Sequence, residues 1–246
     1  MVLLAAAGLS GQASGSILGT AVEFAVLAGT TVTNTGPSVI DGNKVNGDLG
    51  VWPGTAVTGF PPGIMANGTI HAGNAVAQQA QADVTTAYNT LAGMAFDQDL
   101  TGMDLGGMTL TPGVYNFSSS AFLTGTLTLD AQGDPFAQFV FQTGSTLITA
   151  SNSSVVMINS GDACEVYWQV GSSATLGTGT DFLGNILALT SITLTTDATI
   201  LEGRALARNG AVTLDSNLIT ACCPIPAPGA SVMLGACLGL LARRRR

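Results

Sequence analysis

The feature that most constrains the fold is a stretch, residues 184–217, whose pattern occurs twice. Residues 186–188 are matched by residues 205–207, and residues 191–195 are matched by residues 211–215. The offset is about 19–20 residues, and Gly, Asn and Asp separate the short β-branched runs, which is typical of a solenoid. A single coil of this kind cannot bury its apolar side, so the coils must stack on one another.

Strands of three kinds follow one another along the chain. The first kind is apolar throughout, as in residues 166–170, the second alternates apolar and polar residues, as in 191–195, and the third is irregular, as in 155–157. Three kinds in rotation predict three faces. The fold class is therefore expected to be an all-β solenoid, namely an irregular three-faced right-handed β-helix with one long α-helix packed alongside.

The helix is expected at about residues 72–93, within an Ala- and Gln-rich segment that has helical spacing of apolar positions. Asn74 or His71 is expected near its start and Gly93 near its end. Because a strand that is apolar on both sides needs a cover, we expect this helix to lie over the first kind of strand. The positions expected to face the solenoid are Val76, Ala80, Val84, Ala87 and Leu91.

Three segments are expected. Residues 1–15 are interpreted as a signal-peptide remnant or a leader, because a short apolar run precedes small residues. Residues 16–223 are the expected solenoid domain. Residues 224–246 are expected to be a sorting or membrane-anchor tail, because a Pro-rich motif and an apolar run precede four Arg residues. This tail resembles the PEP-CTERM tails of bacterial envelope proteins, although Pro226-Ala227-Pro228 replaces Pro-Glu-Pro. We therefore expect a secreted or surface-attached bacterial protein.

The charge pattern excludes several partners and cofactors. Only 9% of residues are charged, and four of the seven basic residues are Arg243–Arg246, so the rest of the chain has three basic residues against 15 acidic ones. Nucleic acid is excluded as a partner because phosphate binding needs clustered Lys and Arg. With one His and no C-x-x-C pair, neither a metal nor another cofactor is expected. Cys164 is expected to form a disulfide with Cys222 or Cys223, which fits an oxidising compartment.

Hydroxyl-bearing side chains dominate the outward positions of the alternating strands. Neighbouring strands lie about 4.8 Å apart and side chains at i and i+2 about 6.5–7 Å apart, so these residues are expected to form a flat grid. Hydroxyls anchor first-shell water and methyls surround it, so such a grid can hold water in an ice-like arrangement. Ile148 and Asp130 are expected to interrupt the rows. The predicted site residues are Thr31, Thr33, Thr126, Thr128, Thr146, Ser173, Thr175, Ser191, Thr193, Thr195, Ala211 and Thr213.

The chain resembles the ice-binding-protein-like family of bacteria and fungi from about residue 17 to 221. The resemblance implies a discontinuous β-solenoid with a long helix alongside, and ice binding on one flat face. The segments that support it are Leu18-Gly19-Thr20-Ala21, residues 24–28, Gly47-Asp48-Leu49-Gly50, Pro53-Gly54, residues 105–115, residues 123–130, residues 168–177 and residues 203–207.

Other candidate sites have simpler explanations. Asp97, Asp99 and Asp104 lack a nearby His, Lys or nucleophile and are expected to be solvated in loops or to cap turns. Trp168 and Tyr167 lie in a wholly apolar strand and are expected in the core. We therefore expect that the protein is not an enzyme. It is expected to be a monomer whose partner is the surface of an ice crystal, and to contact a membrane only through its C-terminal tail. The alternative is a surface adhesion or structural module on the same scaffold.

Overall fold

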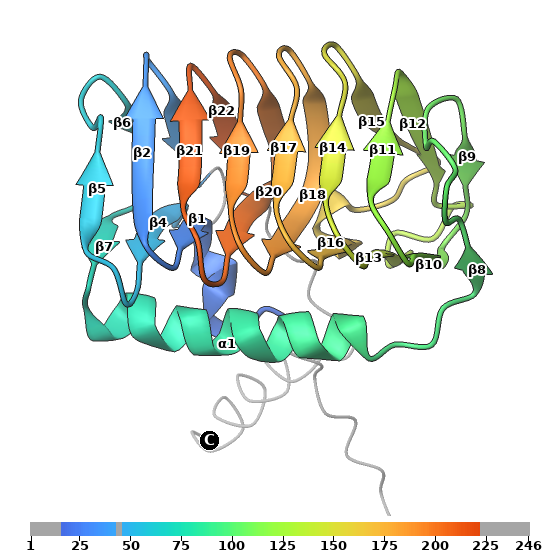
Figure 1. The fold of residues 1–246 in the computed structure, drawn as a ribbon, viewed down its shortest axis with the longest axis horizontal. Helices are drawn as coiled ribbons and strands as arrows, with labels where there is room; N and C mark the ends of the chain where they lie inside the picture. The colour runs from blue at the N-terminus through green and yellow to red at the C-terminus, as the bar shows by residue number, and fades with distance from the viewer. Residues whose placement is uncertain (1–15, 43–45, 222–246) are drawn as a thin grey trace, which may run out of the picture.

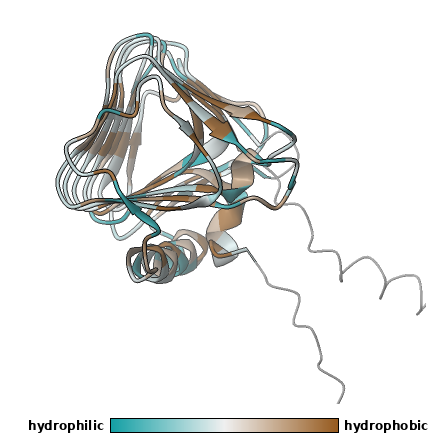
Figure 2. Cartoon of the chain, turned by 90° about the vertical axis from the view of Figure 1, so that its right-hand side faces the viewer, coloured by the Kyte–Doolittle hydropathy of each residue, from teal (hydrophilic) through white to brown (hydrophobic). Residues whose placement is uncertain are grey.

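A computed structural model describes residues 16–42 and 46–221. The chain winds into a stack of coils with a triangular cross-section, and one helix lies against one side of the triangle (Figures 1 and 2). All strand pairs in the two sheets are parallel, as stacked coils require. The predicted three-faced β-solenoid with one helix alongside is confirmed.

The front face, as seen in Figure 1, is a separate seven-stranded sheet in the order β11-β14-β17-β19-β21-β2-β5. Its strands alternate inward apolar side chains with outward ones, and the inward side chains are buried except in β5, where Val57 is half-buried. Its strands are β2 (Thr31–Thr35), β5 (Ala56–Thr58), β11 (Ala121–Leu123), β14 (Leu147–Thr149), β17 (Ala174–Leu176), β19 (Ile192–Leu194) and β21 (Val212–Asp215).

The helix-covered face holds the strands that are buried on both sides. Two long strands, β18 (Asp181–Ala188) and β20 (Thr199–Ala207), turn a corner of the triangle and contribute their second halves to it. Its other strands are β1 (Phe24–Ala28), β4 (Asp48–Val51), β7 (Ile70–Ala72), β8 (Gln98–Asp99), β10 (Gly113–Phe117), β13 (Phe139–Thr143) and β16 (Val166–Val170).

The back face contains the first halves of β18 and β20. It is uncovered, like the front face, among the residues that the structure describes (Figure 2). Its other strands are β3 (Val39–Asp41), β6 (Ile64–Met65), β9 (Thr109–Leu110), β12 (Thr126–Asp130), β15 (Ser154–Ile158) and β22 (Leu218–Thr220).

The order of the coils in space differs from their order in the sequence. Strand β1 lies between β4 and β20, so the first coil packs on the last one. After β7, helix α1 (Ala75–Ala92) runs along the stack and brings the chain to β8 at the opposite end (Figure 1). Its 18 residues extend about 27 Å at 1.5 Å per residue, which covers most of the stack.

Helix α1 begins and ends where the sequence indicates. Asn74 is the N-cap, and its side-chain oxygen accepts a hydrogen bond from the backbone N–H of Ala77, while Gly93 follows the last turn. Val76 was expected to face the solenoid, but it is 49% exposed. Ala77 is buried in its place and packs in the apolar cluster beneath α1.

The repeat at residues 184–217 corresponds to two stacked coils. Residues 186–188 pair with 205–207, and Thr193 pairs with Thr213. Gly184 pairs with Gly203 at the corner between two faces, and a Cβ built on Gly203 would lie 2.0 Å from the carbonyl oxygen of Gly184. The glycines therefore recur because adjacent coils approach too closely at this corner for a side chain.

Aromatic side chains stack through the centre of the solenoid. Tyr115, Phe141 and Trp168 lie on three paired strands, and the rings of Phe141 and Trp168 are 3.9 Å apart between centroids. Trp168 is 1% exposed and Tyr167, on the opposite side of β16, is packed under α1 at 3% exposed. The prediction that both belong to the core is confirmed.

Two short 3-10 helices complete the described elements. The first, η1 (Gly19–Glu23), packs against α1, and the second, η2 (Ala163–Glu165), lies at the corner before β16.

Cys164 in η2 is disulfide-bonded. Cys222 and Cys223 lie outside the described residues, as do the expected leader (1–15) and tail (224–246). Within the described ranges, no helix has the length and apolarity needed to cross a membrane.

Candidate functional site: the threonine row of the front face

Five threonines occupy one continuous row across the front face. Thr58 pairs with Thr33, Thr33 with Thr213, Thr213 with Thr193, and Thr193 with Thr175, each on the neighbouring strand. All five are exposed or half-exposed. Because parallel strands lie about 4.8 Å apart, the row places hydroxyl and methyl groups at a constant spacing. We call Thr58, Thr33, Thr213, Thr193 and Thr175 the central row.

The hydroxyls of the central row face solvent without protein partners. Among the described residues, none of the five donates or accepts a side-chain hydrogen bond. Their χ1 angles are restricted because Thr is β-branched. The row is therefore a stiff array of hydroxyls that are available to water.

The rows on either side use their hydroxyls differently. Ser191 Oγ accepts a hydrogen bond from the Ala211 N–H at 3.2 Å, and Ser173 Oγ accepts one from the Ser191 N–H at 3.3 Å. On the other side, Thr195 Oγ1 donates to the carbonyl oxygen of Leu176 at 2.8 Å. These hydroxyls strengthen contacts between coils, so fewer of their bonding positions remain for solvent.

The predicted grid combined two different faces. Ten of the predicted residues lie on the front face or at its edges: Thr31, Thr33, Thr146, Ser173, Thr175, Ser191, Thr193, Thr195, Ala211 and Thr213. Thr126 and Thr128 do not, because β12 pairs with β9 and β15 on the back face. Asp130 also lies on the back face and does not interrupt the front rows, whereas Ile148 does. Both uncovered faces alternate polar and apolar residues, so alternation alone could not separate them.

Two exposed threonines of the front face lie outside the predicted grid. Thr58 continues the central row on β5, and Thr35 lies at the end of β2, opposite Asp215. A signal for Thr58 was present: Ala56-Val57-Thr58 repeats the tripeptide Ala211-Val212-Thr213. It was not recognised because these tripeptides lie far apart in the chain, on strands that flank β2 in the sheet.

The front face is nearly uncharged and has little twist. Asp215 is the one charged residue within its seven strands as described. Viewed along the stack, the strands of this face superimpose closely (Figure 2). Fully buried side chains back the row, including Val32, Val212 and Ile192. A nearly uncharged sheet with little twist suits an extended, neutral and regular partner.

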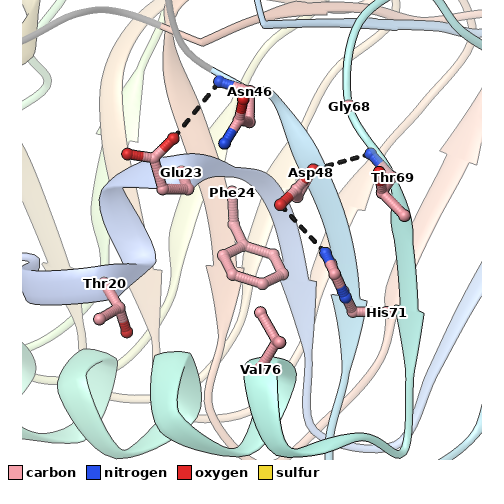
Figure 3. Close-up of a pocket in the computed structure, with 9 residues that line it drawn as sticks. All are labelled: Thr20, Glu23, Phe24, Asn46, Asp48, Gly68, Thr69, His71 and Val76. Atoms are coloured by element: carbon pink, nitrogen blue, oxygen red, sulfur yellow. Dashed lines mark hydrogen bonds and ion pairs between the residues drawn. The ribbon is translucent and has the colours of Figure 1, made fainter.

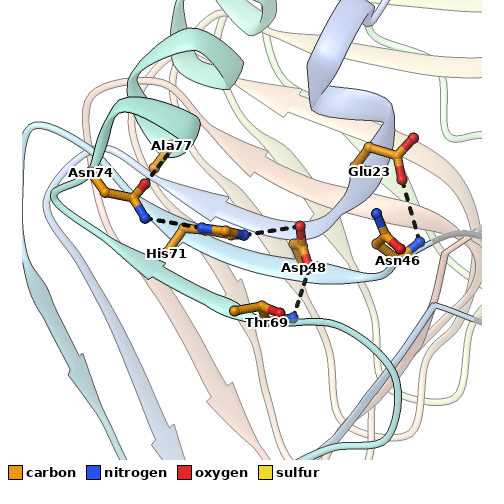
Figure 4. Close-up of polar contacts among 7 residues, drawn as sticks. All are labelled: Glu23, Asn46, Asp48, Thr69, His71, Asn74 and Ala77. Carbon is orange, nitrogen blue, oxygen red and sulfur yellow. Dashed lines mark hydrogen bonds and ion pairs between the residues drawn. The ribbon is translucent and has the colours of Figure 1, made fainter.

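A pocket of about 490 Å³ lies at the other side of the molecule, between η1, β4, β7 and the first turn of α1 (Figure 3). Its polar groups are joined to one another. Asp48 accepts from the Thr69 N–H at 2.7 Å and contacts His71 Nε2 at 3.1 Å, and His71 Nδ1 lies 3.0 Å from the side-chain nitrogen of Asn74 (Figure 4). His71, expected at a turn or cap, instead lies in β7 and links β4 to the capping residue.

This network fixes the start of α1. Because the Asn74 oxygen caps α1, its NH₂ group faces His71 Nδ1, which therefore acts as the acceptor while Nε2–H donates to Asp48. No hydroxyl or thiol is hydrogen-bonded to this imidazole in the described structure. The pocket is therefore best explained as part of the scaffold.

Of the three aspartates after α1, Asp99 and Asp104 cap turns, whereas Asp97 bonds to the backbone of the neighbouring coil. Asp97 accepts from the Val114 N–H, Asp99 from the Thr101 N–H, and Asp104 from the N–H groups of Gly106 and Thr124. Burial acts to raise the pKa of Asp104, but these hydrogen bonds outweigh it and the pKa is lowered. Across the described residues, no three His, Cys, Asp or Glu side chains are grouped so that they could hold a metal ion.

The fold and the front face define a class: parallel β-helix proteins with a lateral helix and one flat, uncovered, neutral sheet. The family model described as "Ice-binding-like" matches residues 26–220. This chain belongs to the ice-binding-like family.

Individual relatives agree with this assignment. The ice-binding protein of Nostoc sp. (strain HG1) is 65% identical over 211 residues, which are 86% of this chain and 76% of that protein. Ice-binding protein 1 of Shewanella frigidimarina is 35% identical over 82% of this chain, which corresponds to only 26% of that longer protein. A crystal structure of an ice-binding protein from an Antarctic biological consortium has a TM-score of 0.78 and 48% identity, and covers 88% of this chain and 96% of its own.

Proposed function

We propose that this protein binds ice through the front face and that the central row is the centre of the contact. The observation that supports the proposal is the register of five threonines whose hydroxyls have no protein partner in the described structure. Water held by such a row is already ordered in the free protein, so little further ordering entropy is lost when the row meets a crystal. Many weak contacts in register then add to one stable attachment.

The other properties follow from this mode of action. Adsorption to a solid surface needs no catalytic group, so the protein is proposed not to be an enzyme. Ice forms outside the cell first, and the disulfide at Cys164 fits an oxidising compartment, so we propose a secreted or surface-attached protein. A single face is sufficient for the contact, and the proposed form is a monomer, with membrane contact only through the C-terminal tail.

The test is a pair of matched substitutions. Thr193 lies in the central row and Thr128 at the equivalent outward position of β12 on the back face, and both are half-exposed. Thr193→Tyr places a ring in the middle of the row. It is expected to reduce thermal hysteresis and inhibition of ice recrystallisation at least about tenfold, because the ring prevents the neighbouring threonines from contacting the ice surface at the same time. Thr128→Tyr is expected to leave both unchanged.

Circular dichroism melting curves of the two variants should match that of the parent, which separates loss of contact from loss of fold. Equal losses in both variants would refute the assignment of the face. An unmodified protein that neither shapes ice crystals nor inhibits recrystallisation would refute ice binding and favour the adhesion module.

A further inference from the structure

We propose that Ile148 and Phe122 end the hydroxyl row and thereby limit the area of ice that the front face can hold. The inference rests on the proposed function. Ile148 pairs with Thr175, the last threonine of the central row, and Phe122 pairs with Ile148. The row therefore runs over seven strands, with threonine on five and apolar side chains on the last two.

The backbone continues unchanged through these two strands. β14 pairs with β17, and β11 with β14, as parallel strands of the same sheet without a break in register. The inward side chains Ala121 and Leu147 are fully buried, like those under the threonines. The scaffold for a longer row therefore exists, and only the side chains at 122 and 148 differ.

The neighbouring row shows that this end of the face still has hydroxyls. Two residues before Phe122 and Ile148 are Ser120 and Thr146, whose hydroxyl oxygens are 2.8 Å apart and hydrogen-bonded to each other. The row two residues before the central row is therefore not interrupted at this end. Their mutual bond also means that this pair does not replace the missing solvent-facing hydroxyls.

The two apolar side chains change the surface in different ways. Ile148 is 38% exposed and has a methyl branch like Thr, but no oxygen to anchor water. Phe122 is 47% exposed, so much of its large ring projects from the sheet. Water over this end has no fixed hydrogen-bond partner in the row, and the ring prevents a flat surface from lying flush against both ends of the face.

The experiment extends the row in two steps. Ile148→Thr adds the sixth hydroxyl, and the double variant Ile148→Thr/Phe122→Thr adds the seventh. Each added contact in register strengthens the attachment to ice, and little further ordering entropy is lost in forming it. We therefore expect that the protein concentration needed for half-maximal thermal hysteresis falls about twofold for the first step and decreases further for the second. Thr is well tolerated at exposed strand positions, and unchanged melting curves would verify the fold.

Two control variants isolate the cause. Ile148→Val has the shape of Thr without the oxygen and is expected to give no gain. Val156→Thr adds the same hydroxyl on the back face, at a position that is also 38% exposed, and is likewise expected to give no gain.

The outcomes separate this inference from the proposed function. If Thr193→Tyr abolishes ice activity while Ile148→Thr and the double variant remain at the parental level, the front face binds ice but the inference is wrong. An equal gain in Ile148→Val would also overturn it, because the hydroxyl would then not be the missing element. If the parent and the extended variants all lack ice activity, the proposed function itself fails.

Discussion

The front and back faces are built from the same alternating strands, yet they present different surfaces. The front face has the central row of unpartnered threonines and one charged residue, Asp215. The back face has five exposed aliphatic side chains, namely Ile64, Val156, Ile158, Leu201 and Leu218. It also has four acidic residues, namely Asp41, Asp130, Asp181 and Glu202.

The hydroxyls of the back face are also largely used within the protein. Thr126 and Ser154 share a hydrogen bond of 2.9 Å, and Thr199 donates to the carboxylate of Asp181 at 3.0 Å. Solvent at this face meets charge, hydrocarbon and mostly occupied hydroxyls, and within the described strands only the pair Thr109 and Thr128 is without a side-chain hydrogen bond. Exposed threonines on a solenoid are therefore not sufficient to order water. They must also be in register, and their hydroxyls must be free to form hydrogen bonds with water.

The largest effect is expected from a charge in the central row. Thr213→Lys introduces a strongly hydrated ammonium group whose water is oriented around the charge and not by the array. Thermal hysteresis should fall more than about tenfold, because the threonines on both sides of the new side chain also lose their contacts with the ice surface. Leu201→Lys, a similar change at an exposed back-face position, should have little effect. Comparable losses in both variants would remove the distinction between the faces.

A second test asks whether the two faces depend on their shared core. Trp168→Ala removes a fully packed ring whose centroid lies 3.9 Å from that of Phe141, and is expected to lower the free energy of unfolding by about 3–5 kcal/mol. The central row is positioned by backbone ladders, so folded protein near 0 °C should retain its ice activity. Urea unfolding and thermal hysteresis measure the two quantities. A loss of stability below about 1 kcal/mol would contradict the expected cavity cost.

The smallest expected effect concerns pH and the helix-covered face. Burial acts to raise the pKa of Asp83 on α1, but hydrogen bonds from the Thr20 hydroxyl, the Thr20 N–H and Gln79 outweigh it, so the pKa of Asp83 is lowered from its ordinary value. A carboxyl with a lowered folded-state pKa stabilises above its unfolded pKa, and this contribution is lost as the pH falls through the folded value.

Asp83→Asn should therefore be slightly less stable than the parent at pH 7, and the difference should shrink as the pH falls below the ordinary pKa of an aspartate. Urea unfolding at several pH values measures this difference. A difference that grows in acid would show that Asp83 does not stabilise the contact between η1 and α1 as the carboxylate.

Much of the site was predictable because outward positions follow from alternation within a strand. The repeat of 191–195 and 211–215 correctly placed Thr193 beside Thr213, and the inward leucines and isoleucines of the same strands are buried as expected. The assignment of Thr126 and Thr128 to the same grid was wrong, because the pattern within a strand does not identify the face to which the strand belongs.

Local sequence patterns were sufficient to predict the stacked coils, the three kinds of strand, the limits of α1 and the near absence of charge. These properties are set by side-chain periodicity, turn residues and the capping of one helix. The insertion of the first coil between the second and the last, which joins Thr33 to Thr58 and Thr213, is visible only in the folded protein. The continuity of the row depends on which coils become neighbours after α1 has traversed the stack, and pairing between distant segments has no local signature.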